Sequence, residues 1–225
     1  MYLRGPKWNM TRRTRKPSNP LKLLFLVAVI GVLIYFSQVV VPTMPVPFIP
    51  TPTATRSPES FLNEAEAFTA QGKLGQAIES YQQAITSDPR NAATYIALAK
   101  VQVLAGFYEE AQDNADNALL LNPNNSMAFA IKAWALNFME DYLGAEATIG
   151  QAIELDNNNA LAYAINAEIL LDQGNYEDIE TAIQMSRRAQ ELAPNALETH
   201  RIRGYVLFYT ANYEDALVEY QAAIA

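Results

Sequence analysis

Residues 108–123 read YEEAQDNADNALLLNP, and the outline of this stretch recurs along the chain at a fixed step. Its aromatic residue and its first and third alanines have counterparts 34 residues later, at Tyr142, Ala145 and Ala152. The same step backward reaches Leu74, Ala77 and Ala84. A period of this length predicts a repeat array in which each unit is a pair of antiparallel helices. Alanines at fixed places let the helices approach closely, while larger residues fill the space between units.

Five units follow from this period, at 58–91, 92–125, 126–159, 160–196 and 197–225. The fourth unit contains three extra residues within 177–181, and the fifth stops inside its second helix. Ser57 before Pro58 predicts the start of the first helix, because serine caps helices and proline suits their first position. Gly72, Gly106 and Gly174 fall where first helices end and a left-handed residue is favoured. The predicted fold class is all-α.

The repeated pattern resembles that of the tetratricopeptide repeat (TPR) family. The family's second helix carries an aromatic, a small residue, a second aromatic, an alanine and a proline, and the first unit places these at Leu74, Ala77, Tyr81, Ala84 and Pro89. The family's small residue in the first helix is found at Ala65, Ala99, Ala133, Ala167 and Gly204. Departures include Ala115 at the second aromatic place and Asn157 at a proline place. The resemblance covers 58–225 and implies a right-handed α-solenoid that binds another protein.

An uncharged apolar run, LLFLVAVIGVLIYFSQVVV, extends from Leu23 to Val41. At about 1.5 Å per residue it spans roughly 28 Å, close to the hydrocarbon thickness of a bilayer. We predict a transmembrane helix at 21–41, after a basic cytoplasmic tail at 1–20 and before a Pro/Thr-rich linker at 42–57. A cleaved signal peptide is the alternative, but its apolar run would be shorter and would end at a small-residue cleavage site.

Charge is divided unevenly along the chain. Seven of the 16 basic residues lie in the first 22 positions, whereas all 24 acidic residues lie at position 59 or beyond. Since basic flanks stay in the cytoplasm, we predict a single-pass protein of the cell membrane with a cytoplasmic N-terminus and an extracytoplasmic body. From residue 43 onward 24 acidic residues accompany 9 basic ones, a formal charge of −15, which disfavours nucleic acid as a partner.

The composition also argues against catalysis. The chain has no cysteine and a single histidine, His200, so most nucleophile–base pairs and common metal sites lack their residues. No phosphate-binding glycine loop, nucleophile elbow or zinc motif occurs in it. We therefore predict no enzyme activity, no cofactor and no metal site.

The resemblance implies that ligands bind in a concave groove lined by the first helices, at the second, fifth, ninth and twelfth places of each unit. The candidate groove residues are Lys100, Val103, Met127, Trp134, Asn137, Glu168, Arg201 and Tyr205. Leu161 and Glu198 also occupy such places. Trp134 is the favoured hot spot, because a large aromatic with one N–H donor suits that role, although packing between repeats is an equal alternative. Replacing Trp134 and Asn137 by alanine is expected to weaken partner binding without unfolding the array.

The leading interpretation is a membrane-anchored scaffold that binds a protein or peptide on the extracytoplasmic side. One alternative is a structural array that self-associates, or is covered by a partner, at the uncapped fifth unit. Another is an organelle import or assembly receptor with its body in the cytosol. Some family members hold a C-terminal carboxylate with lysine and asparagine, but the relevant places here are Leu62, Glu66, Met127 and Ile131. The missing clamp counts against the import receptor.

Overall fold

The computed structural model describes residues 19–40 and 56–224. The chain divides into two units, 1–54 and 55–225, and each is described by itself. Most of the predicted basic tail and most of the predicted linker lie outside the described residues.

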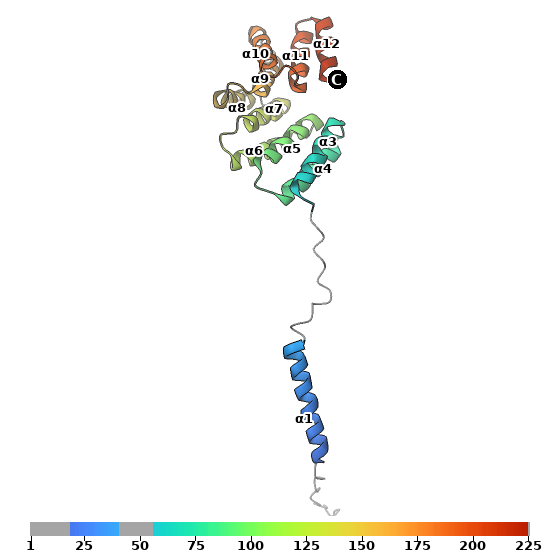
Figure 1. The fold of residues 1–225 in the computed structure, drawn as a ribbon. Coiled ribbons are helices and arrows are strands. Elements are labelled where there is room, and N and C mark those ends of the chain that lie inside the picture. The colour runs from blue at the N-terminus through green and yellow to red at the C-terminus, as the bar shows by residue number, and fades with distance from the viewer. Residues whose placement is uncertain (1–18, 41–55, 225) are drawn as a thin grey trace, which may run out of the picture. The chain divides into compact units, whose positions relative to one another are not determined.

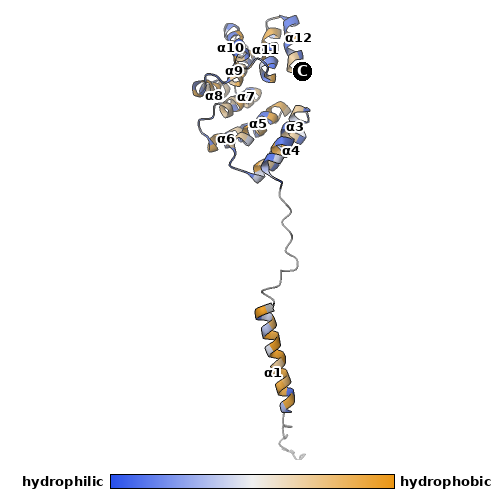
Figure 2. Ribbon diagram, viewed as in Figure 1, coloured by the Kyte–Doolittle hydropathy of each residue, from blue (hydrophilic) through white to orange (hydrophobic). Residues whose placement is uncertain are grey.

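The described part of the first unit is one helix. α1 (Pro20–Tyr35) continues into a π-helical turn, η1 (Phe36–Val40). Asn19 caps its start by accepting the backbone N–H of Leu21 at 3.3 Å, and Pro20 fits the first helical position because its φ is already fixed. Apolar residues predominate along this helix (Figure 2), and their side chains are exposed. Residues 20–39 are long and apolar enough to cross a membrane, as judged by length and composition.

The described part of the second unit consists of five helix pairs (Figure 1). The first helices are α3 (Pro58–Ala70), α5 (Ala92–Ala105), α7 (Ser126–Phe138), α9 (Ala160–Asp172) and α11 (Leu197–Tyr209). The second helices are α4 (Leu74–Ser87), α6 (Tyr108–Leu121), α8 (Tyr142–Leu155), α10 (Ile179–Leu192) and α12 (Tyr213–Ala223). The first helices begin at residues 58, 92, 126, 160 and 197. In the longer fourth unit a short 3₁₀ turn, η2 (Tyr176–Asp178), precedes α10.

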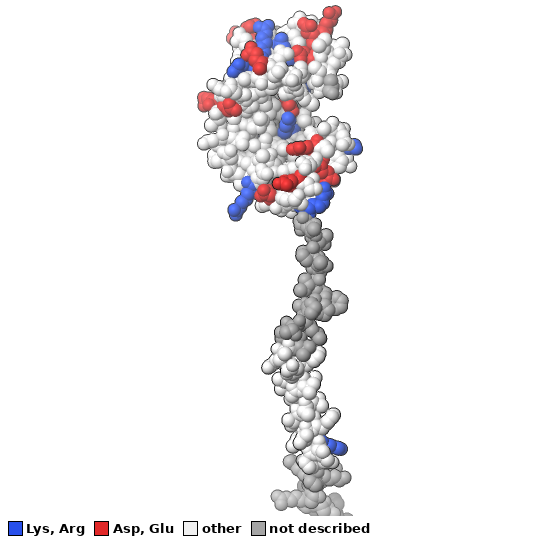
Figure 3. Space-filling view, viewed as in Figure 1, with Lys and Arg blue, Asp and Glu red and all other residues white. Residues whose placement is uncertain are grey.

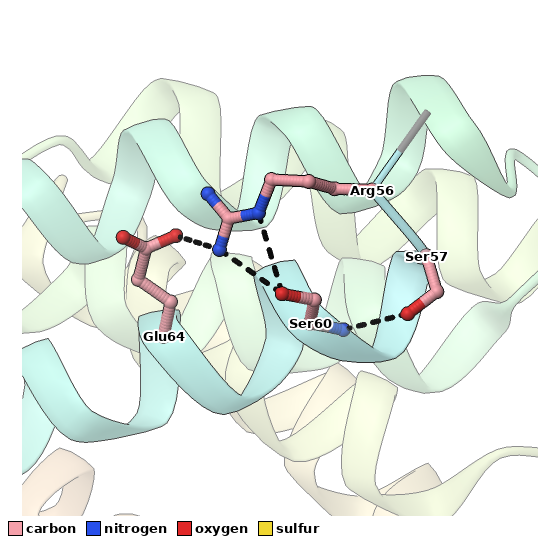
Figure 4. A network of polar contacts seen from close by, with 4 residues as sticks. All are labelled: Arg56, Ser57, Ser60 and Glu64. Atoms are coloured by element: carbon pink, nitrogen blue, oxygen red, sulfur yellow. Dashed lines mark hydrogen bonds and ion pairs between the residues drawn. The ribbon is translucent and has the colours of Figure 1, made fainter. Parts of the chain in front are cut away.

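The start of α3 is fixed by side chains on both sides of the cap (Figure 4). Ser57 accepts the backbone N–H of Ser60 at 3.3 Å, as expected of a capping serine. Arg56 turns back along the helix and donates to the Ser60 hydroxyl at 3.0 Å and to Glu64 at 2.8 Å. Its guanidinium also lies 4.6 Å from the centre of the Phe61 ring. These contacts hold Arg56 and Ser57 against the first turns of α3.

Left-handed residues end the first helices. Gly72, Gly106 and Gly174 have φ values of 70°, 83° and 73°, which confirms the prediction made for them. Two units use other residues at the corresponding turn, where Glu140 and Ala211 have φ values of 63° and 62°. A left-handed conformation costs an L-residue with a Cβ about 1–2 kcal/mol, so packing on either side must hold these two turns.

Small residues lie where the helices cross. Ala65, Ala99, Ala133 and Ala167 are fully buried, in agreement with the role predicted for them. In the fifth unit the same place is Gly204, and a Cβ there would come within 2.9 Å of the Tyr220 ring. The glycine therefore accommodates a large aromatic neighbour at this crossing. The all-α class is confirmed.

Four of the first helices form a continuous layer. α5 packs against α7, α7 against α9 and α9 against α11, in addition to the contacts within each pair. Among the described residues, neighbouring second helices make no comparable contact with one another. α5, α7, α9 and α11 therefore present one shared face, on which their side chains can meet across several units.

Candidate binding site on the concave face

An ion pair shows which way the array curves. Lys100 Nζ on α5 lies 2.6 Å from Glu198 Oε1 on α11, although two complete helix pairs separate these helices in sequence. Such a contact requires the array to bend toward the side of its first helices. That layer is therefore the inner face of the curve, and we call it the concave face.

A second ion pair lies on the concave face between α9 and α11. Arg201 donates two hydrogen bonds to Glu168, one to each carboxylate oxygen and each of 2.7 Å. The same guanidinium lies 5.1 Å from the centre of the Trp134 ring on α7. Glu168 is almost fully buried, and Trp134 is only 1 % exposed. Arg201 thus covers the tryptophan while it neutralises the buried carboxylate.

Asp172, at the end of α9, joins two further candidate residues. It accepts a hydrogen bond of 2.6 Å from the Asn137 side-chain amide and one of 2.7 Å from the Tyr205 hydroxyl. Sequence reasoning missed Asp172 because it stands one place beyond the twelfth place of its unit. An acidic residue one turn after Glu168 was the signal that could have indicated it.

The electrostatics of this cluster follow from burial and from its acidic residues. Burial alone would lower the pKa of Arg201, but its hydrogen bonds to Glu168 and the charges of Glu168 and Glu198 outweigh burial and raise that pKa. Burial, reinforced by the hydrogen bond to Asp172, raises the pKa of the Tyr205 hydroxyl well above its ordinary value. Arg201 is therefore charged and Tyr205 is a neutral donor across the physiological pH range.

Three polar atoms in this cluster are buried without a partner. Among residues 19–40 and 56–224, the buried side-chain atoms that make no hydrogen bond are Trp134 Nε1, Asn137 Oδ1 and Arg201 Nε. Two are donors and one is an acceptor. Buried polar atoms are normally satisfied, so these three atoms leave the cluster with unused hydrogen-bonding capacity.

An open cavity of about 570 Å³ lies beside this cluster, where α7, α9 and α11 begin. Its apolar lining includes Met127, Leu155 and Leu161. Its polar lining includes Asn124, Asn125 and Asn158. Lys100 and Glu198 form part of its wall, so the cavity and the concave face are continuous.

Helix capping places the asparagines of this cavity. Asn125 and Asn159 cap α7 and α9, and their side-chain oxygens accept backbone N–H groups at 3.0 and 3.2 Å. Asn159 also donates to the Ser126 hydroxyl at 2.7 Å, which ties neighbouring units together. The side-chain amide nitrogens of Asn124, Asn125 and Asn158 donate to no described residue. The turns between units therefore leave amide groups free to donate to solvent or to a ligand.

Comparison with known proteins agrees with this architecture. Residues 65–106, from α3 into α5, match the family model of the TPR repeat. A solved structure of a thermophilic TPR protein from Thermus thermophilus covers 75 % of this chain and 90 % of its own, with 14 % identity and a TM-score of 0.64. Residues 65–106 therefore carry the TPR repeat pattern, and the helical body has the fold of TPR proteins. MamA (41-end) from Desulfovibrio magneticus RS-1 covers 74 % of this chain and 93 % of its own, with 17 % identity and a TM-score of 0.49. No curated protein matches the sequence.

The structure divides the predicted groove residues into three kinds. Trp134, Asn137, Glu168, Arg201 and Tyr205 form the connected cluster described above. Lys100 and Met127 line the open cavity. Val103 is buried in the core beneath the concave face.

The burial of Trp134 changes one expectation. Its ring packs in the core and near Phe138, with ring centres 6.2 Å apart. Replacing it by alanine would leave a cavity in the core, so loss of binding by that variant could not be separated from loss of stability. The exposed lining of the cavity offers better positions for a test of binding.

Proposed function

We propose that this TPR protein is a membrane-anchored scaffold that binds an extended segment of a partner polypeptide in the cavity at the edge of its concave face. The observation that carries the proposal is the cavity of about 570 Å³, with apolar and amide walls, where three successive first helices begin. Its volume lies within the ordinary range of ligand sites. An extended peptide can contact both kinds of wall, because its apolar side chains pack on the apolar residues and its backbone carbonyl groups accept hydrogen bonds from the amides.

The side-chain amides of the cavity can recognise a peptide backbone by donating hydrogen bonds to it. Asn124, Asn125 and Asn158 each present an unused side-chain N–H₂ group, and each such group can donate to a backbone carbonyl oxygen. Met127 is exposed at the cavity wall and can pack against a ligand side chain. Methionine adapts its shape to irregular partners, which suits a surface that binds varied peptide side chains.

Binding can be tested without knowledge of the natural partner. The full chain in lipid nanodiscs is exposed to a displayed library of random peptides, and dissociation constants of the enriched peptides are then measured. In the Met127→Trp variant the indole fills part of the cavity, so we expect affinity to fall at least about tenfold, or 1.4 kcal/mol. Leu143→Trp is the matched control, because Leu143 is 81 % exposed on α8 and lies outside the cavity.

Undiminished affinity in Met127→Trp would place the binding surface elsewhere. Equal losses in both variants would point to a general effect of the added indole. Thermal unfolding of each variant, followed by circular dichroism, shows whether the array remains intact.

The anchor rests on α1 and on the charges around it. The helix exposes apolar side chains along its whole length, and the first 22 residues of the chain contain seven basic ones. On the other side Arg56 is the nearest basic residue, and it forms an ion pair with Glu64 at 2.8 Å. Seven basic residues before the helix and only Arg56 close behind it favour a cytoplasmic N-terminus, because orientation follows the count of basic residues.

Protease protection tests the anchor and its orientation. In sealed inside-out vesicles of the host cell membrane, we expect the TPR body to be protected and the N-terminal tail to be cleaved. Detergent should then make the body accessible. Cleavage of the body in sealed inside-out vesicles would place it in the cytosol and favour the receptor alternative. Release of the whole chain by alkaline carbonate would exclude a spanning anchor.

A further inference from the structure

We propose that the cavity accepts a cationic side chain of the partner polypeptide, and that this cation replaces Lys100 as the counter-ion of Glu198. The inference rests on the proposed function and specifies the ligand class for the same site. It predicts a preference for lysine or arginine at one position of the bound segment.

The cavity wall carries more negative than positive charge. Its charged residues are Lys100, Asp156 and Glu198. Asp156 accepts one hydrogen bond, from the backbone N–H of Asn158 at 2.9 Å, and its other carboxylate oxygen has no partner among the described residues. The side-chain oxygens of Asn124 and Asn158 likewise accept from no described residue. A cation entering the cavity thus meets a carboxylate with spare acceptor capacity and two amide oxygens.

The two ends of the Lys100–Glu198 pair differ in their exposure. The Lys100 side chain is 39 % exposed, whereas that of Glu198 is 11 % exposed. Leaving a buried charge unpaired is costly, while an ammonium group on a flexible stem is readily solvated. Exchange of the cation on Glu198 keeps the buried carboxylate neutralised and releases Lys100 to water. An incoming anion would instead take Lys100 and leave the buried Glu198 without its ion-pair partner.

Long-range electrostatics favour the same ligand. The sequence from residue 43 onward has a formal charge of −15, so the body attracts cationic segments and repels acidic ones. Acidic side chains are spread over the face of the body seen in Figure 3, with fewer basic ones among them. The acidic residues of the cavity therefore favour a cation at short range, and the charge of the whole body attracts cations at long range.

The exchange would also loosen the concave face. Among the described residues, the Lys100–Glu198 pair is the only ion pair or hydrogen bond that joins α5 to α11. When the partner's cation takes over Glu198, this link is lost and α5 is free to separate from α11. Binding and opening of the array are then the same event.

The test uses capped heptapeptides of alanine with lysine, arginine, glutamine or glutamate at the centre. Each is titrated into the isotope-labelled full chain in nanodiscs, and the side-chain amide signals of Asn124 and Asn158 are followed by NMR. We expect the lysine and arginine peptides to bind at least about tenfold more tightly than the glutamine peptide, and the glutamate peptide to bind most weakly.

Two variants should shift the affinity in opposite directions. Lys100→Gln removes the competing cation, so the lysine peptide should bind about tenfold more tightly. Glu198→Gln removes the counter-ion, so the same peptide should lose at least about tenfold in affinity. Lys132→Gln is the control, because it breaks a comparable ion pair of 2.7 Å, with Asp116, outside this cavity. If Glu198→Gln does not fold, Asp156→Asn at the exposed wall should still weaken binding.

Weaker binding in Lys100→Gln, or tighter binding of the glutamate peptide, would overturn the inference and leave the proposed function standing. A purely structural role of the ion pair would weaken binding in both variants alike. If no heptapeptide shifts the asparagine signals while displayed peptides still bind at Met127, the inferred preference for a cation is also wrong. If neither class of peptide binds, the proposed function itself fails.

Discussion

Replacement of Trp134 by alanine should lower the free energy of unfolding of the TPR body by about 3–5 kcal/mol. The indole is 1 % exposed and lies in the largest buried cluster, where α7 meets its neighbours. Removing it opens a cavity that close-packed helices cannot fill without distortion. It also removes the aromatic surface under the Arg201 guanidinium. Urea unfolding followed by circular dichroism measures the change.

Tyr176→Ala provides the control for this substitution. Tyr176 is 85 % exposed in the 3₁₀ turn of the fourth unit, so its loss should change the free energy of unfolding by no more than about 0.5 kcal/mol. A cost below about 1 kcal/mol for Trp134→Ala would mean that the ring is not enclosed in solution. The unpartnered Trp134 Nε1 would then be open to a ligand without any movement of Arg201.

Replacement of Glu168 by alanine should lower the free energy of unfolding by about 3 kcal/mol. The substitution removes both hydrogen bonds of 2.7 Å from Arg201 and leaves that guanidinium without its carboxylate. Arg201 is 27 % exposed, so water can solvate part of the unpaired charge. We therefore expect the lower end of the range for a broken buried ion pair.

A double-mutant cycle separates the ion pair from the volume of its side chains. Arg201→Met removes the charge and keeps an apolar stem, and the double variant Glu168→Ala with Arg201→Met leaves no unpaired charge. We expect the double variant to be more stable than Glu168→Ala alone, because the main cost is the orphaned charge. Simple addition of the two single effects would show that the residues do not act as a pair.

The fold could be predicted from the sequence because each repeat carries its own signals. Gly106 and Gly174 mark left-handed turns, Ser57 and Pro58 mark a helix start, and the alanines mark helix crossings. All of these are local, and the 34-residue step places them in register. The extra residues of the longer fourth unit fall at the 3₁₀ turn and the start of α10, where they leave the helix pair intact.

The site was only partly predictable, because the pattern gives the place of a residue within its unit and not the curvature of the array. Curvature is a sum of small rotations from unit to unit. That sum brings Lys100 of the second unit to Glu198 of the fifth, and it covers Trp134 with Arg201 from two units away. No spacing in the sequence contains this information. The cavity at the turns between units depends on the same curvature.

The link between Lys100 and Glu198 also has a mechanical consequence. A helical solenoid behaves as a spring, since a small movement at every interface adds up to a large extension. A strut between the second and fifth units turns those units into a closed loop, in which no interface can yield alone. Tension along the array would be shared between the packed interfaces and this contact, which weakens with ionic strength as other partly exposed ion pairs do. The stiffness of the array should therefore depend on salt, even though its helices do not.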